Sequence, residues 1–543
     1  MTFPFILITA LVISMATIPL MMRLAPRLGM VDLPDPRKVH AHPIPRVGGI
    51  GIALGSIVAI LLWTPLQGWM PAYMLGSIVL LIFGAWDDSR ELGHYVKFIG
   101  QFIAAAAVVY WGGLWVSHFP FLADALPPAI GKPFTVIAIV GMVNAVNHSD
   151  GLDGLAGGES LLSLGCLAYL GYLSGGTDLV LISAAVIGGV FGFLRYNSHP
   201  ARVFMGDSGS QFLGYSLAVL AVLLTQQVNP GLSMAIPALI LGLPIVDILA
   251  VLVQRAYQRM NWFRATKNHV HHRLLELGYR HYEAVVIIYA VQAALVVCAI
   301  LFRYETDSLV IGLYLAVCGL VFITIALAER KGWRARRGNT GNALHRFLEQ
   351  PELRETAARW SMRFIKFGIP AFFLAASLSL HEISADCGWA AALVATITLA
   401  GLLLSRAPRL SSALIRMGVF SAAALLVYLI ERNTATDAMA FTVAQVIFFS
   451  LLTLAIGISI RLSGEEEFRT TPTDYLLVGV VILSSMLAQG QFTDFDLGAV
   501  IVQSVILLYG CELLINRAGS GSGGSLSLAA FLAAVGVTLR FAV

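Results

Sequence analysis

Long uninterrupted apolar runs are the feature of this sequence that most restricts its fold. Runs such as Ile50–Leu66, Ala284–Phe302 and Ser308–Leu327 approach the roughly 20 residues that an α-helix needs to span a bilayer. Charged residues make up only 12% of the chain, against about 25% in soluble globular proteins. The sequence therefore predicts an all-α, multi-pass membrane protein without a large soluble domain. We interpret the first run, Phe3–Met22, as a retained span rather than a signal peptide, because no basic region precedes it.

Lysine and arginine are distributed very unequally between the two sides of about 18 predicted spans. All but four of the 35 Lys and Arg residues fall in loops on one side. The exceptions are Lys132, Arg303, Arg432 and Arg540. Basic loops favour the cytoplasm, so this side is predicted to be cytoplasmic. All histidines except His118 and His381 lie on the same side, and we therefore expect a functional site at the cytoplasmic face.

The chain divides into three segments of different character. Residues 1–330 contain about eleven predicted spans with polar, motif-rich cytoplasmic loops. Residues 331–366 are basic and amphipathic, which fits a helix in the membrane interface and equally a solvated connecting helix. Residues 367–543 contain about seven more spans, without carboxylates or histidines at catalytic spacing. The sequence predicts a multi-span module there but assigns it no role.

Two adjacent carboxylates, Asp87 and Asp88, end the third predicted span. Their mutual repulsion at a membrane boundary is relieved by a divalent cation or a proton. Because adjacent helical residues point in different directions, one carboxylate can bind a metal while the other acts as a base. Lys97 opens the next span and is close enough in sequence to reach back to the same place as a point charge for phosphate.

A second polar segment spaces four oxygen-bearing side chains three residues apart, at Asn144, Asn147, Asp150 and Asp153. If the segment is helical, these residues form one stripe, although the glycines nearby favour a loop toward its end. Side-chain oxygens at this density suit either a hard cation or a nucleoside.

Two glycine-containing segments lie at the start of predicted spans. The run Met205-Gly206-Asp207-Ser208-Gly209-Ser210 provides hydroxyls and backbone N–H groups for phosphate, and Asp207 provides an oxygen for a metal. The run Pro45-Arg46-Val47-Gly48-Gly49 allows a backbone or ligand to approach closely. A plain turn before a helix explains the second run equally well.

A basic, histidine-rich loop contains His269, His271, His272 and Arg273. Imidazoles at this spacing can bind zinc, or they and the arginine can bind a pyrophosphate. We favour pyrophosphate, because the carboxylates elsewhere indicate magnesium and a phosphorylated substrate.

These five motifs, in this order, resemble the polyprenyl-phosphate N-acetylhexosamine-1-phosphate transferases. That family includes the phospho-MurNAc-pentapeptide translocase of peptidoglycan synthesis. It also includes the enzymes that begin O-antigen lipopolysaccharide, enterobacterial common antigen and wall teichoic acid synthesis. The resemblance covers about residues 1–330; the additional C-terminal spans are not general in the family. The run His269-x-His271-His272-Arg273 is closer to the branch that uses UDP-GlcNAc or a similar small sugar.

The resemblance implies ten or eleven spans around a cytoplasmic cleft in the bacterial inner membrane. It implies Mg²⁺ or Mn²⁺, a UDP-N-acetylhexosamine donor and an undecaprenyl phosphate acceptor, with lipid-diphospho-sugar and UMP as products. It assigns catalysis to Asp87, Asp88, Lys97 and Asp153 and the metal to Asp207, Asn147 and Asp88. It assigns substrate binding to Asn144, Asn147, Asp150, His269, His271, His272 and Arg273.

Other classes and several details stay open at this point. A lipid-linked glycan flippase or transporter is the alternative, and it predicts ionisable residues at mid-membrane depth in two related halves. Direct transfer and a two-step route through an aspartyl-phosphate both fit the residues. Membrane lipids are expected partners, nucleic acid is not, and assembly as a homodimer is left open.

Overall fold

The computed structural model describes residues 3–34, 42–90, 92–257, 259, 269–335, 351–380, 383–404, 408–433, 439–462, 497–517 and 522–542. These residues form two compact units, one before residue 336 and one after residue 350. Both units are helical, as the apolar runs predict, and the only described strands form one short two-stranded ladder. Residues 336–350, a part of the linker predicted at residues 331–366, lie outside the described residues.

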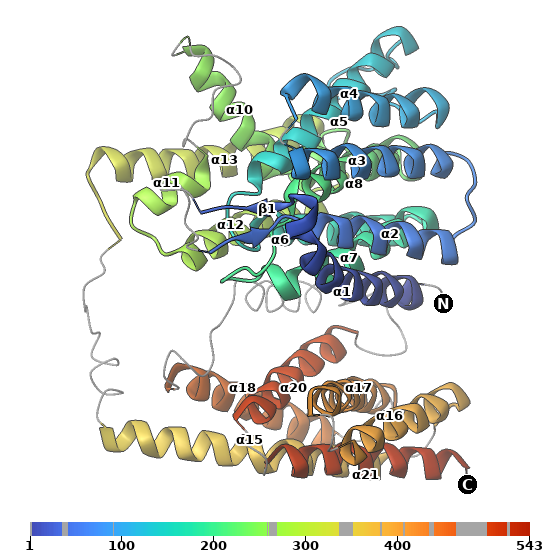
Figure 1. Cartoon of the computed structure of the whole chain (residues 1–543), viewed down its shortest axis with the longest axis vertical. Helices are drawn as coiled ribbons and strands as arrows, with labels where there is room; N and C mark the ends of the chain where they lie inside the picture. The colour runs from blue at the N-terminus through green and yellow to red at the C-terminus, as the bar shows by residue number, and fades with distance from the viewer. Residues whose placement is uncertain are drawn as a thin grey trace. The chain divides into compact units, whose positions relative to one another are not determined.

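The first unit is a bundle in which most helices run alongside one another (Figure 1). Its elements are α1 Phe3–Leu28, β1 Val31–Asp32, β2 Ile44–Pro45, α2 Gly48–Trp63, α3 Met70–Arg90, α4 His94–Ala106, the π-helix η1 Ala107–Trp111, α5 Pro128–Ser149, α6 Leu155–Leu173, α7 Thr177–Asn197, α8 Gly206–Leu223, the π-helix η2 Leu224–Val228, α9 Ile236–Ile240, α10 Gly242–Tyr257, α11 Val270–Glu276, α12 His281–Leu301 and α13 Asp307–Arg330.

The described residues contain ten helices that are long and apolar enough to cross a membrane, together with four shorter apolar helices. Seven of the ten lie in the first unit. In that unit, α4 continues into η1, α8 into η2, and only Leu241 separates α9 from α10. The chain is therefore an all-α polytopic membrane protein.

Helix α8 is the most buried of the candidate spans, and it packs against α2, α3 and α5. Glycines allow these close approaches. A Cβ at Gly49 of α2 would lie 2.0 Å from the Gly209 nitrogen, and one at Gly84 of α3 would lie 2.4 Å from the Ser208 Cα. Small residues at helix contacts in membranes permit this backbone proximity. The contacts bring the C-terminal end of α3 against the start of α8.

The ladder at the start of the fold anchors the chain that leads into α8. Strands β1 and β2 are antiparallel, with Asp32 opposite Ile44, and Arg46 forms an ion pair with Asp32. The Phe204 nitrogen donates to the Pro45 carbonyl at 2.8 Å, and the Gly48 nitrogen donates back to Phe204 at 2.9 Å. The Pro-x-x-Gly-Gly run therefore contacts another backbone segment, which is one of the two uses predicted for its glycines.

The second unit contains six described helices around an apolar core. They are α15 Pro351–Ser379, α16 Ala385–Leu403, α17 Pro408–Asn433, α18 Met439–Leu462, α20 Leu497–Arg517 and α21 Ser522–Ala542. An Arg416–Glu512 ion pair joins α17 to α20, and Gln503 donates to Glu431 at 3.0 Å between the same helices. Residues 463–496, where a further span is predicted, lie outside the described residues.

Candidate active site

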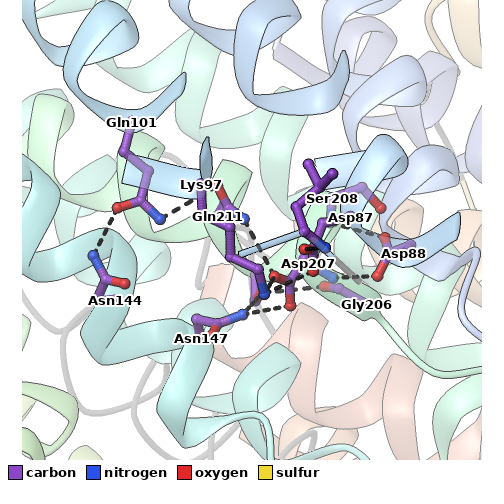
Figure 2. Close-up of polar contacts among 12 residues, drawn as sticks. Asp87, Asp88, Lys97, Gln101, Asn144, Asn147, Gly206, Asp207, Ser208 and Gln211 are labelled. Atoms are coloured by element: carbon purple, nitrogen blue, oxygen red, sulfur yellow. Dashed lines mark hydrogen bonds and ion pairs between the residues drawn. The ribbon is translucent and has the colours of Figure 1, made fainter. Parts of the chain in front are cut away.

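Four helix ends of the first unit meet in a cluster of acidic and amide side chains around one lysine (Figure 2). Asp87 and Asp88 come from the last turn of α3, and Lys97 from the first turn of α4. Asn147 lies in the last turn of α5, and Asp207 in the first turn of α8. Motifs separated by more than 100 residues in sequence thus form one site, as their predicted common function requires.

The Lys97 ammonium lies between two carboxylates. Its Nζ is 2.7 Å from Asp87 Oδ2 and 2.6 Å from Asp207 Oδ2. The other oxygen of Asp207 accepts a hydrogen bond from Asn147 Nδ2 at 2.9 Å, and the same amide donates to Ser210 Oγ at 2.8 Å. Asp87 is buried while Lys97 is partly exposed. Solvent and a substrate can therefore reach the cluster from the side of Lys97.

Asp88 has a different environment from its neighbour. Its two carboxylate oxygens accept the backbone N–H groups of Asp207 at 2.7 Å and Ser208 at 3.1 Å. Gly206 has a φ of 72°, and a Cβ there would lie 2.6 Å from Asp88 Oδ1. Asp88 therefore caps the N-terminus of α8 from another helix. These contacts favour an orienting role for Asp88 over the metal-binding role predicted from the sequence.

A line of amides continues from the cluster toward α5. Gln211 Nε2 lies 3.4 Å from Asp207 Oδ2, and Gln101 Nε2 lies 3.4 Å from Gln211 Oε1. Asn144 Nδ2 then donates to Gln101 Oε1 at 2.7 Å (Figure 2). Asn144 thus joins the predicted site through two glutamines that the motif analysis missed. Their spacing was a usable signal, since Gln101 follows Lys97 by four residues and Gln211 follows Asp207 by four.

Asp150 lies in the loop between α5 and α6, beside the cluster. No hydrogen bond joins its carboxylate to any described residue, and the nearby carboxylates of Asp207, Asp88 and Asp153 repel it. Burial and this repulsion raise the pKa of Asp150 to about 7. The group can therefore gain or lose a proton near neutral pH.

Asp153 lies in the same loop but is held by other partners. Its Oδ2 receives His199 Nδ1 at 2.6 Å and the Ala201 N–H at 3.1 Å, and its own N–H donates to His281 Nε2 at 3.0 Å. Hydrogen bonding to His199 and the nearby His281 holds the pKa of Asp153 below its usual value. These contacts favour a loop-anchoring role for Asp153. Sequence reasoning missed both histidines, which lie outside the five motifs.

The histidine-rich segment begins helix α11. Asp247 of α10, also missed from the sequence, binds His269 Nδ1 at 2.8 Å and the Val270 N–H at 2.9 Å. The His269 ring stacks between those of His148 and His271, with centroids 5.5 and 5.7 Å away. A Cβ at Gly151 would lie 2.2 Å from His271 Nε2. The segment therefore lies against the loop that carries Asp150.

Two further contacts bear on the predicted ligands of this segment. Burial lowers the pKa of His271 to about 3, so His271 is a neutral hydrogen-bonding group at physiological pH. Arg273 makes a two-point contact with Glu329 of α13, at 2.8 and 2.7 Å. The His272 ring packs 4.2 Å from that of His271. Among the described residues, His269, His271 and His272 do not form a group of ligand atoms tight enough for a metal.

The residues around Lys97 fit a hard divalent cation. Asp87 and Asp207 provide oxygens on either side of a position that already attracts a positive charge, the Lys97 ammonium. Asn147 can present its amide oxygen after rotation of the amide. Four carboxylates, of Asp87, Asp88, Asp150 and Asp207, accompany one ammonium, and oxygen-only donors favour magnesium over softer metals.

Comparison with known proteins places the chain in a family. The sequence model of Glycosyl transferase family 4 matches residues 70–225, which include Asp87, Asn147 and Asp207. A Bacillus subtilis strain 168 protein named "Probable undecaprenyl-phosphate N-acetylglucosaminyl 1-phosphate transferase" is 36% identical over 337 residues, which cover 60% of this chain and 92% of the relative.

Two further relatives have related names. The "Decaprenyl-phosphate N-acetylglucosaminephosphotransferase" of Mycobacterium tuberculosis strain H37Rv is 35% identical over 316 residues, covering 52% of this chain and 78% of the relative. The "Undecaprenyl-phosphate alpha-N-acetylglucosaminyl 1-phosphate transferase" of Haemophilus influenzae is 32% identical over 296 residues, covering 52% and 81%. The chain belongs to glycosyl transferase family 4, the polyprenyl-phosphate N-acetylhexosamine-1-phosphate transferases.

Proposed function

We propose that this protein transfers GlcNAc-1-phosphate from UDP-GlcNAc to undecaprenyl phosphate, forming a lipid-diphospho-sugar and UMP. The observation that carries the proposal is the placement of Lys97 between Asp87 and Asp207, next to Asn147, where four helix ends meet. The names of the relatives support the polyprenyl phosphate acceptor and the N-acetylglucosaminyl phosphate group. The transfer would begin the synthesis of a cell-surface glycan.

The reaction joins two anions, so repulsion between them is its main barrier. An acceptor phosphate oxygen forms a bond to the β-phosphorus of the donor while the bond from that phosphorus to the UMP oxygen breaks. Lys97 neutralises phosphate oxygens in this arrangement. The proton released by the acceptor moves to a carboxylate, and Asp150 is suited to receive it because its pKa is about 7. An aspartyl-phosphate intermediate on Asp87 remains the two-step alternative.

A divalent cation, Mg²⁺ or Mn²⁺, completes the proposed site. Asp207, Asp87 and the Asn147 amide oxygen would hold it, and when bound it polarises the phosphoryl oxygens as a Lewis acid. Asp88 keeps Asp207 oriented through the backbone of α8. The neutral imidazole of His271 and the neighbouring His269 can donate hydrogen bonds to the UDP-sugar.

The proposed orientation places this site at the cytoplasmic face of a bacterial inner membrane. The loops that carry the site residues are on the side rich in Lys and Arg, and such loops stay in the cytoplasm. A UDP-sugar is available on that side, and the acceptor phosphate reaches the same surface from within the bilayer.

The carboxylates argue against the flippase alternative. A transporter that moves a charged headgroup across the bilayer needs polar groups at mid-membrane depth. In the first unit, Asp87, Lys97, Asn147 and Asp207 all lie at helix ends. Convergence at helix ends favours chemistry at one membrane surface over passage through the membrane.

A label-transfer assay tests the proposal. Membranes containing the protein are incubated with undecaprenyl phosphate, Mg²⁺ and UDP-GlcNAc labelled in the sugar or in the β-phosphate. We expect both labels to enter lipid, with one UMP released for each lipid formed, and chelation of the metal to stop the reaction. Transfer of the sugar label without the phosphate label would contradict the proposed bond cleavage.

Two comparisons sharpen the assay. UDP-GalNAc in place of UDP-GlcNAc tests the proposed sugar. Asp207→Asn is expected to abolish transfer at every Mg²⁺ concentration, whereas Asp124→Asn, in an exposed loop away from the cluster, serves as the matched control. Full activity of the Asp207 variant would refute the assignment of the site.

A further inference from the structure

A second cluster of metal-ligating side chains lies outside the Lys97 cluster. It consists of Asp153 from the α5–α6 loop, His199 from the α7–α8 connection and His281 from the first turn of α12. One ligand atom from each of the three lies within 4.8 Å of the others. Within the described parts of the chain, no other group of three His, Cys, Asp or Glu residues is this close.

The ring nitrogens of the cluster already face its centre. His281 Nε2 accepts the Asp153 N–H at 3.0 Å, so the neutral ring carries its proton on Nδ1. An ion bound at Nε2 would take over this lone pair and break the hydrogen bond to the Asp153 N–H. That Nδ1 is buried and has no hydrogen-bond partner among the described residues. His199 Nδ1 lies 2.6 Å from Asp153 Oδ2, and the two rings stack with centroids 4.3 Å apart.

The separations are close to those that a tetrahedral metal needs. Zinc binds imidazole nitrogen and carboxylate oxygen at about 2.0–2.2 Å, which places its ligand atoms about 3.4 Å from one another. Asp153 Oδ2 lies 2.6 Å from His199 Nδ1 and 3.9 Å from His281 Nε2. Side-chain shifts on the order of 1 Å would equalise these distances. The His199 side chain is 39% exposed, which gives an ion access from solvent.

We propose that Asp153, His199 and His281 form a binding site for Zn²⁺ or a similar transition-metal ion. Two imidazoles and one carboxylate leave a fourth position for water, as in zinc sites with three protein ligands. The nitrogen ligands select a transition metal, whereas the oxygen-only donors around Lys97 select magnesium. The metal replaces the proton shared by His199 and Asp153, and that proton passes to solvent.

Zinc at this position would join three parts of the first unit. It would tie the α5–α6 loop, which also carries Asp150, to α12 and to the α7–α8 connection. The same loop is already held there by the Gly154 N–H, which donates to Asn197 at 2.7 Å, and by Tyr289, which donates to the Gly154 carbonyl at 2.6 Å. Bound zinc should therefore raise the unfolding temperature of the protein.

The test measures binding without reference to catalysis. The full-length protein in detergent, freed of metal by chelation and kept in excess Mg²⁺, is titrated with Zn²⁺ against a chromophoric chelator. In parallel, Co²⁺ serves as a spectroscopic substitute. We expect one Zn²⁺ per chain, a higher unfolding temperature, and a Co²⁺ spectrum with ligand-field bands but no thiolate band. A thiolate band would overturn the assignment in favour of cysteine.

Variants locate the site. His199→Gln and Asp153→Asn are expected to weaken Zn²⁺ binding at least tenfold and to remove the thermal shift, while His118→Gln, on the opposite side of the membrane, leaves both unchanged. His271→Gln tests the histidine-rich segment. Absence of stoichiometric zinc in the parent protein, or loss of zinc in the His271 variant with retention in the His199 variant, would refute the proposal. If His199→Gln fails to fold, the Asp153→Asn titration decides in the same way.

Discussion

Replacement of Asp88 by asparagine tests whether Asp88 orients Asp207 or binds the metal itself. The carboxylate accepts two backbone N–H groups at the start of α8, from Asp207 at 2.7 Å and Ser208 at 3.1 Å. Hydrogen bonds to a charged acceptor contribute about 1.5–3 kcal/mol each. The amide of the Asp88→Asn variant would keep one acceptor and turn an NH₂ group toward the other N–H, so about 2–3 kcal/mol of this local stabilisation should be lost. The first turn of α8 would then be free to shift.

Such a shift affects turnover more than metal affinity. Because a displacement of about 1 Å can reduce a rate by about 10²-fold, we expect Asp88→Asn to lower kcat by about 10- to 100-fold. The Mg²⁺ concentration for half-maximal activity should stay within about threefold of the parent value, since both oxygens of Asp88 are oriented by the backbone of α8 rather than toward Lys97. Asp87→Asn is the matched comparison, because Asp87 contacts Lys97 directly at 2.7 Å.

The measurement is a Mg²⁺ titration of lipid-linked sugar formation for the two variants and the parent. Asp87→Asn should raise the half-maximal Mg²⁺ concentration by about tenfold or more, because a ligand is lost. An increase of that size for Asp88→Asn, with little change in kcat, would refute the capping role. It would restore Asp88 as a metal ligand, as its place in the acidic pair predicts.

Three further perturbations follow from the contacts. Because the pKa of Asp150 is raised, its contribution to stability is present at low pH and is lost as the pH rises from about 4 to about 7. Asp150→Asn should therefore stabilise the metal-free protein at pH 8, by no more than about 4 kcal/mol, and should not stabilise it at pH 4. An equal effect of the substitution at both pH values in thermal unfolding would count against this reasoning. Gly49→Ala places a Cβ 2.0 Å from the Gly209 nitrogen and should cost about 1–3 kcal/mol, whereas Gly141→Ala, with open space around it, should be neutral in the same unfolding assay. Arg273→Lys loses the two-point contact with Glu329, and because that pair is partly exposed, the unfolding free energy should fall by less than about 1 kcal/mol.

Motif spacing predicted which residues gather at the Lys97 cluster, because each motif combines an unusual polar group with a helix end. Asp87, Lys97, Asn147 and Asp207 all lie in the first or last turn of a helix. Charged groups in a membrane protein are restricted to such positions unless they are paired. Hydrophobic patterning likewise predicted the helical, multi-pass fold, since length and apolarity alone decide which segments can span a bilayer.

Roles within the site could not be predicted in the same way. Asp87 and Asp88 are chemically identical neighbours, and only the approach of α8 to α3 through Gly84 decides which of them meets backbone N–H groups. Asp153 has the same spacing from Asp150 as Asp150 has from Asn147. It is held by His199 and His281, whose approach depends on tertiary packing with no local signal. The identities of the side chains indicated the chemistry of the site, whereas contacts between helices distant in sequence determine which residue has which role.

The site shows how several carboxylates are kept together at a membrane surface. Asp87 accepts the Leu92 N–H of the α3–α4 connection at 2.6 Å. Asp88 accepts the free N–H groups at the start of α8, and Asp247 accepts one at the start of α11. Helix N-termini stabilise negative charge in this way. Asp150 is different, because the described residues give it no donor and three nearby carboxylates repel it. A proton or a cation close to Asp150 would therefore relieve a repulsion that no described hydrogen-bond donor offsets.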